Sequence, residues 1–492
     1  MKKFDLVVVG GGSGLMVVEA ALQKGKTCAL IERGKFGGTC LTKGCIPSKM
    51  LVYPADMIRE AQKAGRIGLD FEPPRVDWQK ISKRLWQQID FHRKIEKSFG
   101  QLEGLTIYKG SAEFTGKKTL RVKEPDDGYS QEFEGEIIVL AAGAHSFVPP
   151  ISNLEQTGYL TSESFFGDKY PEKPWDSLVI LGGGAIGAEF AHIFSAFGTK
   201  VTLIDRNPRI IKTEEAEVSA FVEAELRAGG VEVLTTCDVI SSGRSGDKKH
   251  ITLENNRSRE RQVVEAEEIL IASGIRSNSD SLHLENTDIE TDAAGWVKTN
   301  ALLETSQRDV YAIGDINGLY QFRHKANYEA EILINNLFGT GVKKSACYSA
   351  VPWAIFTNPQ VAHLGMTETQ AKETGKPYWV GKNHYSQIAG GISMGISEHS
   401  ADNGFVKIII GEEKTILGVH IVGPHASMLV QPFVYLMNSK HRCGQKEVKK
   451  ADSLICPPVG SYAPIHDSMV IHPSFNELTA WALDNVDWSK GS

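Results

Sequence analysis

The chain has 492 residues, enough for about three domains with large cores. Its formal net charge of -6 gives no electrostatic basis for binding nucleic acid or an anionic membrane. The N-terminal apolar run is too short for a signal-peptide core, and no apolar stretch is long enough to span a bilayer. Seven cysteines without a framework pattern indicate a reducing compartment. We therefore expect a cytoplasmic protein with neither a membrane nor a nucleic-acid partner.

The chain begins with the pattern of a βαβ dinucleotide-binding unit. A predicted strand at residues 6–9 leads into a glycine turn, an amphipathic helix and a second strand at 27–31. Such glycines let backbone N–H groups approach a pyrophosphate at the helix N-terminus, and the acid after the second strand accepts hydrogen bonds from a ribose. Leu15 replaces the third glycine of G-x-G-x-x-G, so the helix must pack differently on its strand. The predicted binding residues are Gly10, Gly12, Gly14 and Glu32.

The redox-relevant motif follows directly, as Cys40 and Cys45 in GGTCLTKGCIPSK. Their spacing alone permits a metal half-site, a structural disulfide or a redox pair. Zinc would require a second pair, and the other five cysteines are scattered, so we expect no metal site. A six-residue ring restrains little chain entropy and is readily reduced. The spacing therefore favours a redox pair.

A second βαβ unit lies between predicted strands at residues 177–181 and 200–204, with a complete glycine fingerprint. Two such units imply two dinucleotides that exchange electrons, and the second resembles a nicotinamide site. Its terminal carboxylate, Asp205, would repel the 2′-phosphate of NADP, which favours NAD. Arg206 and Arg209 could offset part of this repulsion. The predicted binding residues are Gly182, Gly184, Gly187 and Asp205.

The remaining elements are read from hydrophobic patterning. A charged segment from about residue 54 to 101 predicts a surface helical hairpin. After about residue 346, alternating segments such as 405–410 and 416–422 predict an antiparallel sheet with helices. Further buried strands are predicted at 137–143, 269–274 and 310–315. The first two of these end at Gly143 and Gly274.

Over essentially its full length the chain resembles the flavoprotein disulfide reductases. It carries in that family's order the cysteine motif, the two βαβ units, VYAIGD, FTNPQVAHLGMTETQA, LGVHIVGPHA and HPSFNE. The resemblance implies an α/β fold with two Rossmann-like dinucleotide-binding domains and a C-terminal α+β dimerisation domain. The expected segments are 1–150 (FAD domain, first part), 151–276 (NAD domain), 277–345 (FAD and central domain) and 346–492 (dimerisation domain).

The resemblance also implies roles around the cysteines. FAD would occupy the first dinucleotide site and NAD the second. Cys45 would be the charge-transfer thiolate beside the flavin, and Cys40 the interchange thiol that attacks the substrate disulfide. Lys49, one helical turn beyond Cys45, would lie near the flavin and pair with Glu189, which would border the nicotinamide pocket.

Residues from the second half of the chain would complete the site. Asp315 would bind the flavin ribityl chain, with Gly143 a further FAD contact and Gly274 an NAD contact. His472 and Glu477 in HPSFNE would form the acid–base dyad, with the histidine supplied by the partner subunit. A homodimer with an active site shared between subunits would then be required for activity.

Within the family, GIRSN, HKA and VGPHA look most like dihydrolipoamide dehydrogenase, whose substrate is a lipoyl-bearing protein. KMLVYPAD, HKANYEA and Leu15 resemble mycothione reductase instead, which leaves an NAD(P)H-dependent reductase of a small disulfide as an alternative. A non-catalytic scaffold or redox sensor is a third reading. Two departures stand out: Thr42 and Lys43 between the cysteines, and a long segment at 438–467 that is either a surface loop or a docking element.

Overall fold

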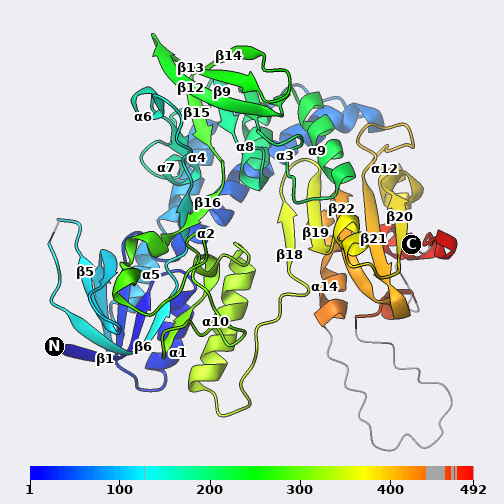
Figure 1. The fold of residues 1–492 in the computed structure, drawn as a ribbon. Coiled ribbons are helices and arrows are strands. Elements are labelled where there is room, and N and C mark those ends of the chain that lie inside the picture. The colour runs from blue at the N-terminus through cyan, green and yellow to red at the C-terminus, as the bar shows by residue number, and fades with distance from the viewer. Residues whose placement is uncertain (127, 439–459, 467–469, 471–473, 491–492) are drawn as a thin grey trace, which may run out of the picture.

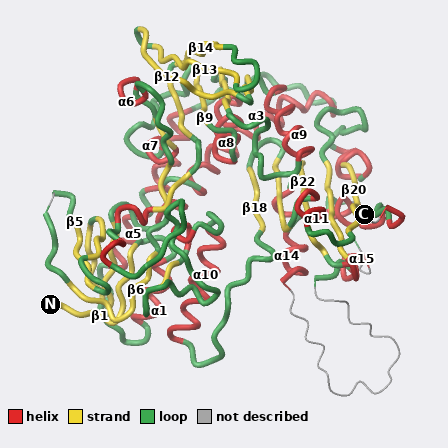
Figure 2. Tube along the Cα trace, viewed as in Figure 1, coloured by secondary structure: helices red, strands yellow, loops and turns green. Residues whose placement is uncertain are grey.

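Three principal sheets with their covering helices make up the chain, as the computed structural model shows (Figures 1 and 2). The structure describes residues 1–126, 128–438, 460–466, 470 and 474–490. Most of the 438–467 segment, with Cys443 and Cys456, lies outside the described residues, and so does His472. No helix in the described ranges is long and apolar enough to cross a membrane.

The N-terminal sheet has seven strands. Six follow the order β3-β2-β1-β6-β5-β4, and the seventh, β17, pairs with the last three residues of β6. The strands β1, β2, β3, β6 and β17 are parallel, and their apolar side chains form two buried clusters on either side of the sheet. The strands are β1 (Lys2–Val9), β2 (Cys28–Glu32), β3 (Leu105–Lys109), β4 (Ser111–Phe114), β5 (Thr119–Lys123), β6 (Phe133–Leu140) and β17 (Val310–Ala312). The helices are α1 (Gly14–Leu22), α2 (Gly38–Thr42), α3 (Cys45–Lys63), α4 (Trp78–Ile89), α5 (His92–Phe99) and α10 (Arg323–Phe338).

The middle of the chain forms a second parallel sheet in the order β11-β10-β9-β15-β8. A three-stranded antiparallel sheet, β12-β13-β14, is attached to it, and the short pair β7 and β16 joins the first two domains. The strands are β7 (Ala144–Ser146), β8 (Leu160–Thr161), β9 (Ser177–Leu181), β10 (Lys200–Ile204), β11 (Glu232–Leu234), β12 (Cys237–Ser245), β13 (Lys248–Asn255), β14 (Arg261–Ala266), β15 (Glu268–Ile271) and β16 (Ile275–Ser277). The helices are α6 (Leu154–Thr157), α7 (Ser162–Phe165), α8 (Ala185–Ala196) and α9 (Ala216–Ala228).

The C-terminal part confirms the predicted antiparallel sheet, whose order is β18-β19-β22-β21-β20. The edge strand β18 faces the nucleotide domain, and the opposite edge strand β20 carries the last helix, α16 (Figure 1). The strands are β18 (Pro352–Ile355), β19 (Gln360–Gly365), β20 (Tyr378–His384), β21 (Phe405–Gly411) and β22 (Ile416–Gly423). The helices are α11 (Glu368–Glu373), α12 (Ala389–Ser393), α13 (Ala426–Leu429), α14 (Gln431–Asn438), α15 (Ala463–His466) and α16 (Asn476–Asp484).

The predicted helical segment at 54–101 is helical, but the prediction of a surface hairpin is wrong for α4. Trp78, Leu85 and Ile89 on α4 are buried in a core cluster shared with α8. The Trp78 ring stacks on Tyr170 with centroids 5.6 Å apart. The charged residues of α4 occupy its outer face, so composition alone concealed an amphipathic helix that joins the two nucleotide-binding domains.

Candidate redox and dinucleotide site

The first glycine turn has the conformation that a dinucleotide loop requires. Gly10 has a φ of 110°, and a Cβ atom there would lie 2.2 Å from the carbonyl oxygen of Ala141. A Cβ on Gly14 would lie 2.6 Å from Val8 Cγ1, so this glycine provides the close approach of α1 to β1. Leu15 is buried in the neighbouring core cluster. The rearranged packing predicted from Leu15 is therefore achieved by moving the close contact back one residue.

The same loop leaves room beside it for a bound group. A Cβ on Gly12 would meet nothing closer than 3.8 Å, and one on Gly143 would meet nothing within 4 Å. Glu32 accepts hydrogen bonds of 2.6 Å from the backbone N–H groups of Gly11 and Gly34, which fixes its carboxylate at the turn. An open cradle of backbone amides at a helix N-terminus fits the pyrophosphate of a dinucleotide.

The second glycine turn repeats this design with the complete fingerprint. A Cβ on Gly187 would lie 1.8 Å from the carbonyl oxygen of Gly182, so α8 packs directly against the turn. Gly184 and Gly274 border open space, where an added Cβ would have no neighbour within 4 Å. The second glycine turn therefore leaves room for a dinucleotide, as the first glycine turn does.

Asp205 closes the second turn. Its Oδ2 accepts a hydrogen bond of 2.7 Å from the Gly183 backbone N–H, and its Oδ1 accepts two of 2.7 Å from the backbone and side-chain nitrogens of Asn207. Arg206 pairs with Asp238 across 3.6 Å. The Asp205 carboxylate at the end of β10 is therefore held in place by three hydrogen bonds. The neighbouring Arg206 is paired with Asp238 instead.

The two motif cysteines lie at a helix junction, Cys40 within α2 and Cys45 at the first position of α3. Both are free thiols in this structure, with Cys40 half-buried and Cys45 exposed. A hydrogen bond from the Cys40 thiol lowers the pKa of Cys45 to about 7; burial opposes this shift and the charge of Lys49 assists it. The same hydrogen bond, together with burial, raises the pKa of Cys40. Of the two thiols, Cys45 therefore ionises more readily, and Cys40 retains its proton.

Lys49 and Glu189 form the predicted ion pair, with Lys49 Nζ 2.7 Å from Glu189 Oε2. Glu189 belongs to α8, and its Oε1 accepts a hydrogen bond of 2.9 Å from the backbone N–H of Phe356, just after β18. Lys49 Nζ also lies 4.3 Å from the centre of the Phe356 ring. One short network therefore joins the redox helix, the second nucleotide domain and the C-terminal domain beside Cys45.

The two unusual residues between the cysteines have local structural partners. Lys43 Nζ lies 3.1 Å from Glu163 Oε2, and Glu163 also accepts the backbone N–H of Ser146 at 3.0 Å. Thr42 is buried and donates its hydroxyl to the carbonyl of Gly38 at 2.9 Å. Lys43 therefore anchors the cysteine loop to the start of α7.

Asp315 lies in a 3-10 turn after β17, so the strand predicted at 310–315 ends three residues earlier than expected, at Ala312. Burial raises the pKa of Asp315 to about 6, while the charge of Lys325 acts in the opposite direction. Lys325 and Glu329 form a buried ion pair with a 3.0 Å separation on α10. Glu329 also accepts a hydrogen bond of 2.7 Å from the backbone N–H of Gly314. A desolvated carboxyl on a fixed turn fits the predicted contact with a polar chain such as ribityl.

Glu477 lies away from the cysteines within one chain. It is 1% exposed at the start of α16, and its Oε2 accepts the backbone N–H of Ser474 at 3.3 Å. The helix packs on β20 so closely that a Cβ on Gly381 would lie 2.2 Å from the carbonyl of Ala482. Because neighbouring strands are about 4.8 Å apart, four strand steps separate β20 from β18 by about 19 Å. The fold therefore does not bring Glu477 to the thiols of its own subunit.

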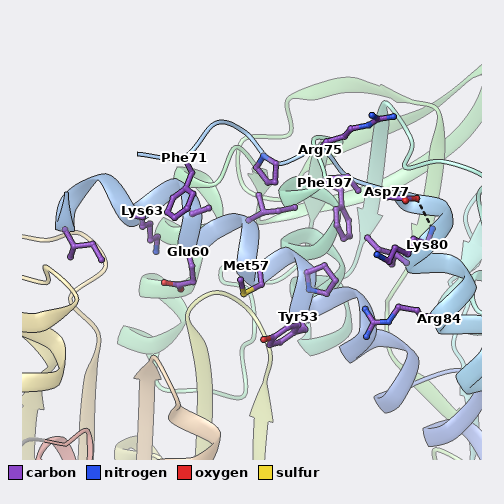
Figure 3. A pocket seen from close by; sticks show the side chains of 18 of the residues that line it. Tyr53, Met57, Glu60, Lys63, Phe71, Arg75, Asp77, Lys80, Arg84 and Phe197 are labelled. Carbon is purple, nitrogen blue, oxygen red and sulfur yellow. Dashed lines mark hydrogen bonds between the residues drawn. The ribbon is translucent and has the colours of Figure 1, made fainter. Parts of the chain in front are cut away.

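Sequence reasoning missed an apolar groove of about 760 Å³ along the outer side of α3, whose lining includes Tyr53, Met57 and Phe71 (Figure 3). Tyr53, Met57 and Phe71 are 70%, 55% and 61% exposed. The signal was present in the sequence, because α3 carries apolar residues on its outer face as well as on its buried face.

Comparisons with known proteins agree with this geometry. Residues 4–330 match the family model "Pyridine nucleotide-disulphide oxidoreductase", and residues 351–451 match the dimerisation domain of the same family. In solved structures, the Cu(II) complex of the HOCl-induced flavoprotein disulfide reductase RclA from Escherichia coli superposes with a TM-score of 0.81 at 26% identity, over 99% of both chains.

Relatives of known function diverge in their substrates. Dihydrolipoyl dehydrogenase from Bacillus subtilis is 30% identical over 87% of this chain and 90% of its own length. Mycothione reductase from Mycobacterium tuberculosis is 31% identical over 89% and 93%. Mercuric reductase from Staphylococcus aureus is 31% identical over 87% and 76%. The chain belongs to the pyridine nucleotide-disulphide oxidoreductase family and is an FAD-dependent disulfide oxidoreductase with a C-terminal dimerisation domain.

Proposed function

We propose that the protein is an NAD-dependent dihydrolipoyl dehydrogenase, which oxidises a protein-bound dihydrolipoyl group through the Cys40–Cys45 pair. The observation that carries the proposal is the Lys49–Glu189 ion pair beside Cys45, because it joins the redox helix to the second dinucleotide domain. The similarity to the Bacillus subtilis dihydrolipoyl dehydrogenase supports the substrate. The fixed carboxylate of Asp205 supports NAD over NADP.

The sulfur chemistry balances with this chain's own residues. A thiolate of the substrate dithiol attacks Cys40 of the oxidised pair, the Cys40–Cys45 bond breaks, and Cys45 leaves as a thiolate. The second substrate thiol then attacks the mixed disulfide, which releases the oxidised substrate and leaves both cysteines reduced. A pKa of about 7 suits Cys45 to the role of leaving group, and the raised pKa of Cys40 lets it retain a proton at the end.

FAD bound by the first glycine loop, Glu32 and Asp315 would supply the electron transfer between the thiol pair and the nicotinamide. Lys49 would hold a positive charge beside the flavin and the Cys45 sulfur, and Glu189 would keep that ammonium in place. Gly184 and Gly274 would leave room for NAD at the second loop.

The acid–base step would come from a second copy of the chain. His472 would take and return the thiol protons, and Glu477 would orient its ring. The width of the C-terminal sheet supports this arrangement, since Glu477 is carried at the edge opposite the one that meets Glu189. The exposed groove along α3, the helix whose first residue is Cys45, would be covered by that second copy.

A second candidate is the reduction of a small disulfide with NAD(P)H. It is favoured by the match to mycothione reductase, which is as extensive as the match to dihydrolipoyl dehydrogenase. In this candidate the same thiol chemistry runs in reverse, and the pyridine nucleotide is the electron donor.

Steady-state kinetics would distinguish the two candidates. We expect kcat/KM to be highest with dihydrolipoamide and NAD⁺, and NADH to be preferred over NADPH in the reverse direction. Asp205→Ala should reduce the preference for NADH over NADPH. Asp238→Ala, which frees Arg206 from its partner, should reduce that preference less, because the Asp205 carboxylate remains. Rapid turnover of a small thiol disulfide with NADPH, with little activity on dihydrolipoamide, would refute the proposal and support the second candidate.

A further inference from the structure

Three side chains capable of binding a metal meet where the nucleotide domain packs on the C-terminal sheet. His363 on β19 and His420 on β22 are register partners in the sheet, with ring centroids 4.5 Å apart. Glu214 reaches them from the loop before α9. All three side chains are buried, and one possible ligand atom of each lies within 4.8 Å of the other two.

Backbone carbonyls fix both imidazole rings in the same way. His363 Nε2 donates a hydrogen bond of 3.0 Å to the carbonyl of Gly365, and His420 Nε2 donates one of 2.8 Å to the carbonyl of Met366. In metal sites the non-ligating ring N–H is usually held by a carbonyl or carboxylate, which sets the tautomer and the ring orientation. This leaves Nδ1 of His420 as an available ligand atom, whereas a cation at His363 would replace the hydrogen between its Nδ1 and Glu214.

These Nδ1 atoms differ in their partners. His363 Nδ1 lies 2.9 Å from Glu214 Oε2, while Glu214 Oε1 accepts a hydrogen bond of 2.7 Å from Trp353 Nε1. His420 Nδ1 is buried and has no hydrogen-bond partner among the described residues. A buried lone pair left without a partner costs about 1–3 kcal/mol, which a bound cation would recover.

The surrounding charges also favour a cation. Four carboxylates lie along this junction, and two ammonium groups of the described residues face them, so negative charge is in excess there. Lys407 Nζ contacts three of the carboxylates at 2.6 to 3.1 Å. The carboxylates are those of Glu214, Glu215, Glu217 and Glu368, and the ammonium groups are those of Lys382 and Lys407.

We propose that Glu214, His363 and His420 bind a divalent metal ion of the zinc class. Two imidazole nitrogens and one carboxylate oxygen are a zinc donor set. The site is remote from solvent, so the ion would serve to fasten the nucleotide domain to the C-terminal sheet. With metal–ligand bonds of about 2.1 Å, tetrahedral ligand atoms lie about 3.4 Å apart. Ligand atoms that lie up to 4.8 Å apart would therefore have to move together by up to about 1.4 Å around the ion.

The metal content of the purified holoenzyme tests the proposal. The protein is produced with zinc in the medium, oxidised so that its redox thiols are not ligands, dialysed against metal-free buffer and analysed by plasma mass spectrometry. We expect about one zinc per chain, and background levels in Glu214→Gln and His363→Gln. His250→Gln, a histidine on β13 outside the cluster, should retain the metal.

A second measurement covers the case in which a variant fails to fold. Chelation of zinc from the wild-type protein should lower its melting temperature, and added Zn²⁺ should restore it, because a ligand that binds only the folded state stabilises it. Protein produced with cobalt should show the visible bands of tetrahedral Co²⁺. A wild-type holoenzyme without bound metal, or metal content that is unchanged in folded Glu214→Gln and His363→Gln, would overturn the proposal.

Discussion

Replacing Lys49 with methionine should raise the pKa of Cys45. Methionine keeps the apolar stem of the side chain but removes the ammonium group that favours the thiolate. It also leaves Glu189, whose side chain is only 12% exposed, without its 2.7 Å partner. Glu189 disfavours ionisation of the nearby thiol, and in the variant the charge of Lys49 no longer offsets that effect.

The size of the effect follows from these charges. An ordinary cysteine thiol has a pKa near 8.5, and Cys45 is lowered to about 7, chiefly by Cys40 and then by Lys49. An opposite charge nearby is worth about 1 pKa unit or more. An increase of about 1 unit would cut the ionised fraction at pH 6.5 about eightfold. A less acidic thiolate is more nucleophilic, so the alkylation rate should fall about threefold.

The assay is iodoacetamide alkylation of the reduced, flavin-free protein across a pH range. Lys43 lies between the cysteines, so trypsin releases Cys40 in FGGTCLTK and Cys45 in GCIPSK, and mass spectrometry follows each thiol separately. In Lys49→Met the second cleavage site is lost, and Cys45 is followed in the longer peptide that ends at Arg59. The matched variant is Glu189→Gln, which retains an oxygen for the Phe356 N–H and should move the Cys45 midpoint downward. Equal midpoints in all three proteins, or shifts of the same sign in both variants, would refute the reasoning.

Three further predictions concern stability. Gly187→Ala should lower the free energy of unfolding by about 1–3 kcal/mol, because its Cβ would overlap a backbone carbonyl, whereas Gly184→Ala, which faces open space, should leave the melting temperature of the flavin-free protein nearly unchanged. Lys325→Met should cost about 3–5 kcal/mol in urea unfolding, because it leaves the buried Glu329 carboxylate unpaired. Asp315 binds a proton more tightly in the folded than in the unfolded flavin-free chain (pKa about 6 against about 3.9), so the free energy of unfolding should fall by about 3 kcal/mol as the pH rises through that window. Asp315→Asn should abolish that loss.

The sequence alone was sufficient to predict those parts of the site that are formed by a few consecutive residues. The glycine loops at Gly10 and Gly182 adopt positive φ angles against the next parallel strand, as a short phosphate-binding turn demands. The ion pair between Lys49 and Glu189 spans 140 positions, and only the resemblance to a family could predict it. The role of that pair at the flavin stays a prediction.

Features that arise from packing between distant segments could not be read from the sequence. Trp78 became a core residue because α8 covers it, although its own segment is charged. The proposed metal site was hidden for the same reason, since Glu214 and His363 are 149 positions apart and no short spacing motif joins them. If zinc is found there, the expectation of no metal, which rested on cysteine spacing, is wrong.

The C-terminal sheet contacts three regions of proposed function: the redox network, the helix that carries Glu477, and the proposed metal site. Its β18 edge is tied to the redox network through the Phe356 N–H, and its β20 edge carries α16 with Glu477. Between them, β19 and β22 present His363 and His420 to the nucleotide domain. A metal ion at the centre would fix the angle of the sheet to its own nucleotide domain, and that angle determines where its far edge delivers Glu477 to a second subunit. The metal site and the shared active site are therefore coupled through the geometry of this sheet.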